Sequence, residues 1–201
     1  MPESPCYLTT AMKLRTTLFI LSSAWLSIAT AQDNQQDDQA VQIEVPEVAL
    51  LDLESNNGTS ITLSIEAPEE AGEPVNFDHA VDTSIWINYS SVIGSSTEPT
   101  RNVYAKITSG TVPSGLRLRV RASQDAGSGD GDLGVRTSWQ NLNGNDKRVI
   151  RDIGTCYTGD GAGKGHQLTY ELSLRNGSNR YAQIDFDDAT TLTVLYTISN
   201  D

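Results

Sequence analysis

Cysteine is almost absent from this sequence: 201 residues contain two, Cys6 and Cys156. Cys6 lies in an N-terminal segment that we expect to be removed, so Cys156 has no partner within the mature chain. An unpaired cysteine in a secreted protein is either a buried thiol or a link to another molecule. Burial is the favoured prediction, because free cysteine is among the most buried residue types. Stability must then come from packing and from backbone hydrogen bonds.

Positive charge and histidine are also scarce. Lysine and arginine number 14 against 26 aspartate and glutamate residues, which gives a formal net charge of −12. Such a chain repels nucleic acid and anionic lipid, so neither is expected as a primary partner. The charge suits solubility outside the cell, and it also suits attraction of cations or of a basic partner. His79 and His166 are the only histidines. No catalytic signature surrounds them or Cys156, so we do not expect an enzyme.

No apolar run is long enough to span a bilayer comfortably. The longest apolar stretch covers residues 18–28 and is interrupted by serines. It follows Lys13 and Arg15 and precedes Ala29-Thr30-Ala31, which is the order of regions in a secretory signal. We therefore predict a signal peptide over residues 1–31, with Met12 as a candidate true start. The protein is then secreted, to the periplasm, the cell surface or the medium.

Most of the remaining chain alternates apolar and polar residues with period two, which indicates half-buried β-strands. No segment shows a sustained helical period. Residues 32–40 are acidic and polar and are predicted to be a flexible leader. Asn176-Gly177 is a strong hairpin signal between two of the expected strands. The expected extended segments are 41–45, 47–53, 60–66, 83–89, 101–107, 116–121, 135–139, 148–153, 168–174, 181–186 and 192–198.

These segments, separated by turn signals, predict an all-β fold: one antiparallel β-sandwich, Ig-like or pilin-like, over residues 41–201. Two Gly-rich loops, at 122–134 and 155–165, carry aspartates. Calcium prefers several converging oxygen ligands, so these carboxylates are a candidate metal site, although Asp and Gly are also ordinary turn formers and that interpretation is favoured. The candidate ligands are Asp125, Asp130, Asp132 and Asp160.

Three arginines, Arg117, Arg119 and Arg121, are expected on the outer face of one strand. They form either an interaction patch for an acidic surface on another copy, or a solvated face balanced by acids of a neighbouring strand. The second interpretation is slightly favoured. Trp86 and Trp139 are expected in the core, with stacking on a sugar as the alternative.

Three motifs support a resemblance to known proteins. They are SGTVPSGL at 109–116, IGTCYTGDG at 153–161 and HQLTY at 166–170, and they resemble motifs of a group of small secreted proteins from Gram-negative, Bacteroidota-type bacteria. That resemblance implies no activity. More loosely, the strand pattern is similar to fimbrial subunits of the spore-coat-protein-U type and to other pilin-like sandwiches, although many usher-pathway pilins have a disulfide that this chain lacks.

The pilin resemblance implies that a terminal strand of one copy completes the sheet of the next. Here the candidate donor covers residues 41–53, with apolar positions Val41, Ile43, Val45, Val48 and Leu50. We therefore expect a secreted, non-catalytic structural protein: a subunit of an extracellular or cell-surface filament, adhesin or matrix, which binds itself or another surface protein. The alternative is a calcium- or carbohydrate-binding sandwich module. Apart from calcium, no cofactor is expected.

Overall fold

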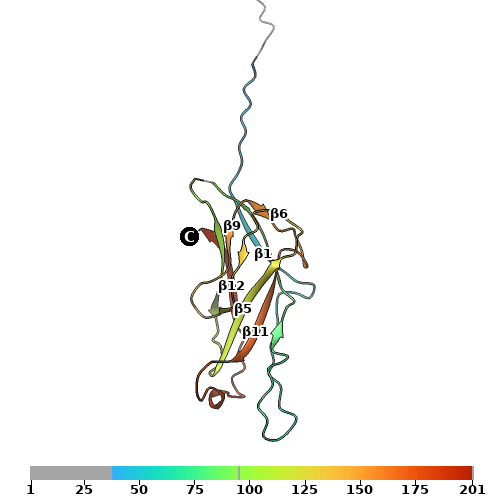
Figure 1. Cartoon of the computed structure of the whole chain (residues 1–201), viewed down its shortest axis with the longest axis vertical. Coiled ribbons are helices and arrows are strands. Elements are labelled where there is room, and N and C mark those ends of the chain that lie inside the picture. Colours follow the sequence, from blue (N-terminus) through green and yellow to red (C-terminus); the bar gives the residue numbers. More distant parts are fainter. Residues whose placement is uncertain (1–37, 95, 201) are drawn as a thin grey trace, which may run out of the picture. The chain divides into compact units, whose positions relative to one another are not determined.

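The computed structural model describes residues 38–94 and 96–200. It confirms the predicted β-sandwich, because two antiparallel sheets pack against each other and hold nearly all the regular structure (Figure 1). By its contacts the chain divides into Met1–Ile43 and Glu44–Asp201, and every strand lies in the second unit. The predicted signal peptide and most of the predicted leader lie outside the described residues. No helix in the described part of the chain is long and apolar enough to cross a membrane.

The larger sheet has eight strands. β1 forms its edge beside β3, and β11 and β5 make the longest antiparallel pair within it. The strands of this sheet are β1 (Val48–Glu54), β2 (Val81–Asp82), β3 (Trp86–Val92), β5 (Leu116–Asp125), β6 (Asp130–Gly131), β8 (Gln140–Asn141), β10 (Cys156–Tyr157) and β11 (His166–Leu174).

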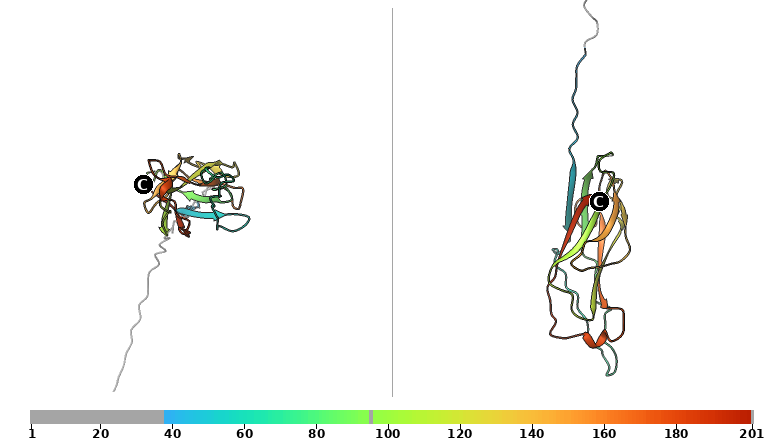
Figure 2. Two further views of the ribbon diagram at one scale, coloured as in Figure 1. Left: turned by 90° about the horizontal axis from the view of Figure 1, so that it is seen from below. Right: turned by 90° about the vertical axis from the view of Figure 1, so that its left-hand side faces the viewer.

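The smaller sheet has four strands in the order β12, β4, β9 and β7. β12 is an edge strand that pairs with β4 alone, and it contacts β1 at the edge of the larger sheet. Figure 2 shows the two layers from two further directions. The strands of this sheet are β4 (Arg101–Ser109), β7 (Val135–Arg136), β9 (Lys147–Ile153) and β12 (Thr193–Asn200).

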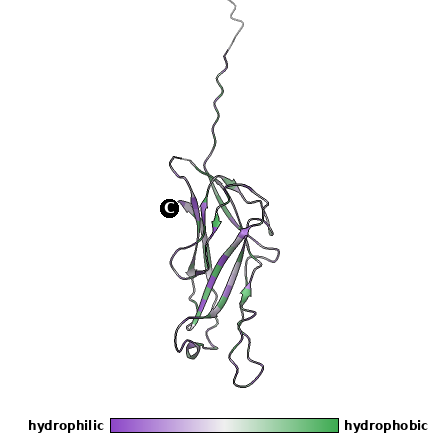
Figure 3. Cartoon of the chain, viewed as in Figure 1, coloured by the Kyte–Doolittle hydropathy of each residue, from purple (hydrophilic) through white to green (hydrophobic). Residues whose placement is uncertain are grey.

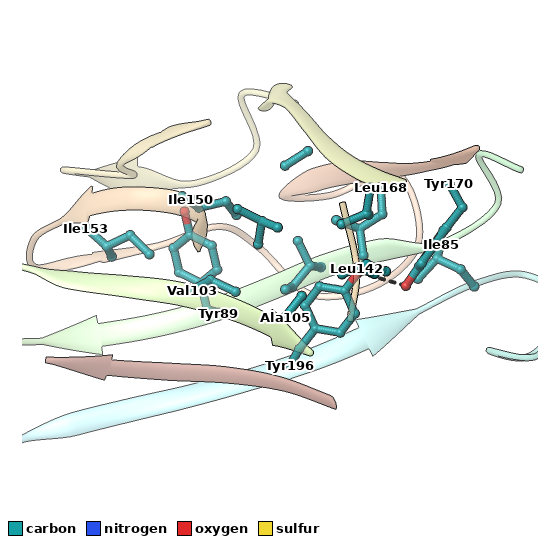
Figure 4. Close-up of a cluster of buried hydrophobic side chains, with 14 of the residues drawn as sticks. Ile85, Tyr89, Val103, Ala105, Leu142, Ile150, Ile153, Leu168, Tyr170 and Tyr196 are labelled. Carbon is teal, nitrogen blue, oxygen red and sulfur yellow. Dashed lines mark hydrogen bonds between the residues drawn. The ribbon is translucent and has the colours of Figure 1, made fainter. Parts of the chain in front are cut away.

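The core lies between the sheets and is made by alternate residues of the long strands (Figure 4). Ile87, Val103, Val120 and Leu168 are fully buried there. Burying one such side chain stabilises the fold by roughly 1.5–3 kcal/mol. Polar residues occupy the intervening positions on the outer faces, and this alternation is visible along β5 and β11 (Figure 3).

Two tryptophans that we expected in the core lie outside it. Trp86 stands between Ile85 and Ile87, which both point inward, so the strand period places Trp86 on the outer face. Trp139 lies in the connection before β8 and is also only half-buried. The hydrophobic size of these side chains suggested burial, but the period of two determined their direction.

The strand predicted at 60–66 is wrong. Ile61, Leu63 and Ile65 are half-buried and the residues between them are exposed, so the predicted alternation of side chains is present. The segment nevertheless belongs to no ladder, apart from an isolated bridge between Glu66 and Asn76. An extended backbone with period two can bury alternate side chains without a hydrogen-bonded neighbour, and the sequence pattern does not separate the two cases.

The return strand predicted at 181–186 is also wrong. Residues Tyr181–Gln183 form a 3-10 helix, η1, within a long connection to β12. The proposed hairpin needed a free edge on β11, but β5 pairs along one side of that strand and β3 and β2 pair along the other. Because both edges of β11 are occupied, the chain after Asn176-Gly177 has to leave the sheet.

Candidate functional site

A groove of about 980 Å³ opens between the sheets, at the end where β2 and β12 begin. Its floor consists of core residues, among them Ile85, Leu118 and Tyr170. Ile85 and Tyr170 lie together at one end of the core in Figure 4. The phenol of Tyr170 shares a hydrogen bond of 2.8 Å with Tyr196 of the smaller sheet, and burial raises the pKa of Tyr170 to about 12. The walls are residues 59–67 and 184–194. We call this hollow the end groove.

Each wall of the end groove contains a stretch whose backbone is unpaired. Within the described chain, no backbone–backbone hydrogen bond involves residues 59–65 or residues 189–192. Unpaired N–H and C=O groups beside an apolar surface are the features to which an extended peptide adds as a strand. The end groove therefore has the chemistry of a strand acceptor.

Two glycines hold the C-terminal wall in place. Gly110 and Gly115 have φ angles of +76° and +77°, and a Cβ atom on either would lie 2.4 Å from a backbone oxygen, of Thr191 and of Arg180 respectively. Only glycine tolerates both the conformation and the close approach. The connection between β4 and β5, which contains both glycines, thus positions the chain that leads into and along this wall.

The rim of the end groove is acidic and carries an exposed aromatic ring. Glu66, Asp185 and Asp188 line the groove, and Phe186 beside them is almost fully exposed. No lysine or arginine lines it. This environment favours an apolar occupant with neutral or basic groups at its ends.

The predicted donor segment divides into two parts in the structure. Val41, Ile43 and Val45 belong to no strand and are 73%, 82% and 74% exposed. Val48 and Leu50 belong to β1, which pairs residue by residue with β3 of the same copy. Residues 48–53 are therefore part of their own sheet, and the donor prediction is corrected to residues 41–45.

A buried arginine anchors the beginning of β1. Arg101 is 1% exposed; its guanidinium lies 2.5 Å from a carboxylate oxygen of Glu47 and 3.3 Å from one of Glu98. It also donates to the carbonyl of Val48 and, from Nε, to Asn200 at 3.0 Å. One side chain thereby joins the start of β1 to the end of β12. Sequence reasoning missed Arg101, because nothing in its local pattern distinguishes it from a surface arginine.

The structure brings no three of the predicted calcium ligands together in the described part of the chain. Asp125 accepts a hydrogen bond from the Gly127 amide at 2.7 Å, and Asp130 accepts one from the Gly131 amide at 2.8 Å. Asp160 lies in a different hollow, described below. Across residues 38–94 and 96–200, no three His, Cys, Asp or Glu side chains are placed to hold a metal ion. Asp125 and Asp130 act as turn formers here.

The arginine stripe, which comprises Arg117, Arg119 and Arg121, lies on the outer face as predicted. Arg117 donates to Ser173 at 3.0 Å, and Arg119 forms an ion pair with Glu171 at 2.5 Å. Acids of the neighbouring strand therefore balance the stripe only in part. The guanidinium carbons of Arg119 and Arg121 both lie 4.7 Å from the ring centroid of Trp139.

A polar cluster is buried under the loop after β5. His166 is 1% exposed; its Nε2 lies 2.8 Å from the Tyr89 hydroxyl and its Nδ1 lies 3.0 Å from the Ser123 carbonyl. Burial is the main cause that lowers the pKa of His166. The ring is therefore neutral at physiological pH, and the Tyr89 hydroxyl itself donates to the carbonyl of Leu133. Through these contacts the cluster joins β3, β5 and β11.

Cys156 belongs to the same region, and the prediction of a buried thiol is confirmed. Burial raises the pKa of Cys156 to about 11, and the charges of Asp132 and Asp125 act in the same direction. The thiolate is the reactive form of cysteine, so Cys156 is unreactive at neutral pH.

Comparison of the chain with protein-family models, with curated proteins and with solved structures found no match. The case for a function therefore rests on the end groove and on the surfaces around it.

Proposed function

We propose that this protein is a secreted, non-catalytic structural subunit of an extracellular or cell-surface filament, adhesin or matrix. In this proposal, copies join when residues 41–45 of one copy add as a strand to the end groove of the next. The observation that carries the proposal is the pair of groove walls, 59–65 and 189–192, whose backbone groups are unpaired beside an apolar floor. The predicted signal peptide supports secretion.

The exposed donor segment matches this acceptor in its pattern. Val41, Ile43 and Val45 fall on one face of an extended chain, and Gln42 and Glu44 fall on the other. An added strand would turn the three apolar side chains to the groove floor and the polar ones to solvent. Full burial of each would contribute roughly 1.5–3 kcal/mol before the entropic cost of ordering the segment.

The position of the donor favours exchange between copies. Glu47 is held by Arg101 at the start of β1, whereas the end groove is lined by Leu53 near the other end of that strand. The seven residues of β1 span about 20 Å. The segment before Glu47 is therefore attached to the end of β1 that is far from the end groove. Head-to-tail contacts of this kind generate an open chain of copies, unless the rotation between neighbouring copies closes the chain into a ring.

The test is a substitution experiment on the secreted chain beginning at Gln32. The triple variant Val41→Ser, Ile43→Ser, Val45→Ser removes the apolar face of the donor, and the matched control Gln42→Ser, Glu44→Ser changes only its polar face. Truncation to residue 60 is unsuitable, because it also removes β1 from its own sheet. We expect ladders on unboiled gels and filaments by negative-stain microscopy for the wild type and the control, and monomers for the triple variant. Equal assembly of the triple variant and the wild type, or a wild type that stays monomeric, contradicts the proposal.

A further inference from the structure

The outer face of the eight-stranded sheet carries two oppositely charged regions. One is the arginine stripe on β5. The other is a hollow of about 560 Å³ over β1, β3 and β10, which we call the acidic groove. Its lining includes Leu50, Asp52, Asn88, Ser90, Tyr157 and Asp160.

Arg121 in the stripe lacks a polar partner. Its guanidinium stacks on Trp139, but no acceptor among residues 38–94 and 96–200 takes a hydrogen bond from it. Arg117 and Arg119, in contrast, have hydrogen bonds to β11. A half-buried guanidinium has five donors that require acceptors. Stacking on Trp139 fixes its orientation, so Arg121 is ready to bind a carboxylate.

The acidic groove, in contrast, has carboxylates without cationic partners among the described residues. Asp52 and Asp160 line it, and neither forms an ion pair with any described residue. Tyr157 and Leu50 are exposed beside them. Asn88 in its lining is 4% exposed, and its Oδ1 has no hydrogen-bond partner in the described chain. An aromatic ring, an aliphatic side chain and two carboxylates together suit an arginine side chain, whose stem is apolar and whose head is cationic.

The two regions lie diagonally across the same face. Asp52 is paired in register with Asn88 on β3, and Arg121 is paired with Thr169 on β11. Gln167, opposite Trp86, lies between them on that face. From the spacing of strands and residues, Asp52 and Arg121 are roughly 20 Å apart. They are therefore too far apart to neutralise each other within one copy.

We propose that two copies of this chain associate face to face through this sheet, related by a two-fold axis that passes over Gln167. Arg121 of each copy then enters the acidic groove of the other, with its guanidinium against Asp52 and Asp160 and over Tyr157. A two-fold interface requires this reciprocity, in which residue i contacts residue j and j contacts i. Each copy carries both the arginine stripe and the acidic groove, so a second copy can pair with both regions at once.

Charge and area both favour a second copy as the partner. An acidic polymer would match the stripe but would be repelled by the acidic groove and by the net charge of −12. A basic protein would match the groove but not the stripe. The four long neighbouring strands β1, β3, β11 and β5 present an outer face of roughly 500 Å² per copy, or roughly 1,000 Å² in the dimer, which is the size of a weak interface. The face is polar, so the association is weak and sensitive to salt.

This contact is independent of strand addition, and its test is run without the donor. All proteins carry Val41→Ser, Ile43→Ser and Val45→Ser in the full secreted chain. One partner adds Arg121→Glu and the other adds Asp52→Lys. In a homodimer each reversal places like charges together twice, but in the mixed dimer both contacts become attractive again. Sedimentation equilibrium at low and at physiological salt gives the dissociation constants, and thermal melting checks that each variant is folded.

We expect each reversal alone to weaken the dimer at least about tenfold, and the mixture to return to within about threefold of the parent. The control pair Arg136→Glu and Asp78→Lys, outside this face, should leave the dimer unchanged, alone or mixed. A parent protein that is monomeric throughout, single reversals that dimerise like the parent, or a mixture no tighter than the single variants would each overturn the inference. None of these results tests strand addition, because every protein in the experiment lacks the apolar face of the donor.

Discussion

Arg101 is the residue that joins the start of β1 to the end of β12. It is the only fully charged side chain among the described residues that is almost completely buried, and its partners belong to the start of β1, the loop before β4 and the end of β12. Sequence reasoning had no means to find it, because its burial depends on how four segments meet. The burial of Cys156 was predictable from the sequence, since an unpaired cysteine is most often buried, whatever the fold.

Replacing Arg101 should destabilise the domain strongly. Arg101→Met retains much of the apolar stem but leaves the carbonyl of Val48 and the side chain of Asn200 without their donor. We expect the free energy of unfolding to fall by about 3 kcal/mol in urea titration. Glu47→Gln should cost less than about 1 kcal/mol, because Glu47 is mostly exposed and water can replace its contact. Similar losses for the two variants would contradict the anchoring role.

His166 makes a second residue-scale prediction, which concerns pH. Burial lowers the pKa of His166 below its ordinary value of 6.5, so the unfolded chain binds a proton at a higher pH than the folded chain does. Stability is therefore unaffected above pH 6.5 and falls as the pH decreases from there towards the lowered pKa. Urea titrations between pH 7 and pH 5 should show this loss in the wild type. His166→Gln should reduce the slope, whereas His79→Gln, at an exposed site, should retain it.

At the scale of elements, the period of two predicted the direction of side chains better than the pairing of strands. The alternation in β5 and β11 gave the correct inner and outer faces, and it would have placed His166 inward beside Leu168 and Tyr170. The predicted pairing was wrong at 60–66 and at 181–186, because a strand also needs a neighbouring strand with a free edge. Whether such an edge is free depends on strands that are distant in the sequence, and the local pattern carries no information about them. The end groove, bounded by these two failures, was therefore not predictable from the sequence.

The glycines behind the C-terminal wall give a test at this scale. Gly110→Ala and Gly115→Ala force a Cβ atom into a left-handed backbone and against a carbonyl oxygen at 2.4 Å. We expect each to lower the free energy of unfolding by about 2–3 kcal/mol, or to disorder the wall locally. Gly144→Ala is the matched control, because nothing lies within 4 Å of its Cβ position. If all three variants unfold at the same urea concentration, the wall is not held as described.

At the scale of the whole molecule, the β-sandwich domain has two different ends, and one face carries both the arginine stripe and the acidic groove. β1 begins at the Arg101 end, and the end groove opens at the other end. Strand addition would join copies end to end, and the charged face of the larger sheet would join such chains side by side. The sandwich class was predictable because many short alternating segments admit few other folds. The difference between the two ends of the domain was not predictable from the sequence, since it depends on where β1 pairs.

The central claim is that residues 41–45 of one copy occupy the end groove of another, and intermolecular crosslinking tests it most directly. The secreted chain carries Cys156→Ala together with Ile43→Cys in the donor and Leu63→Cys in the groove wall, and mild oxidation traps a contact between copies. The account predicts a ladder of disulfide-linked multimers on non-reducing gels, and much less crosslinking when Gln42→Cys, on the opposite face of the donor, replaces Ile43→Cys. Absence of a ladder, or equal ladders from the two positions, would contradict strand addition in the end groove.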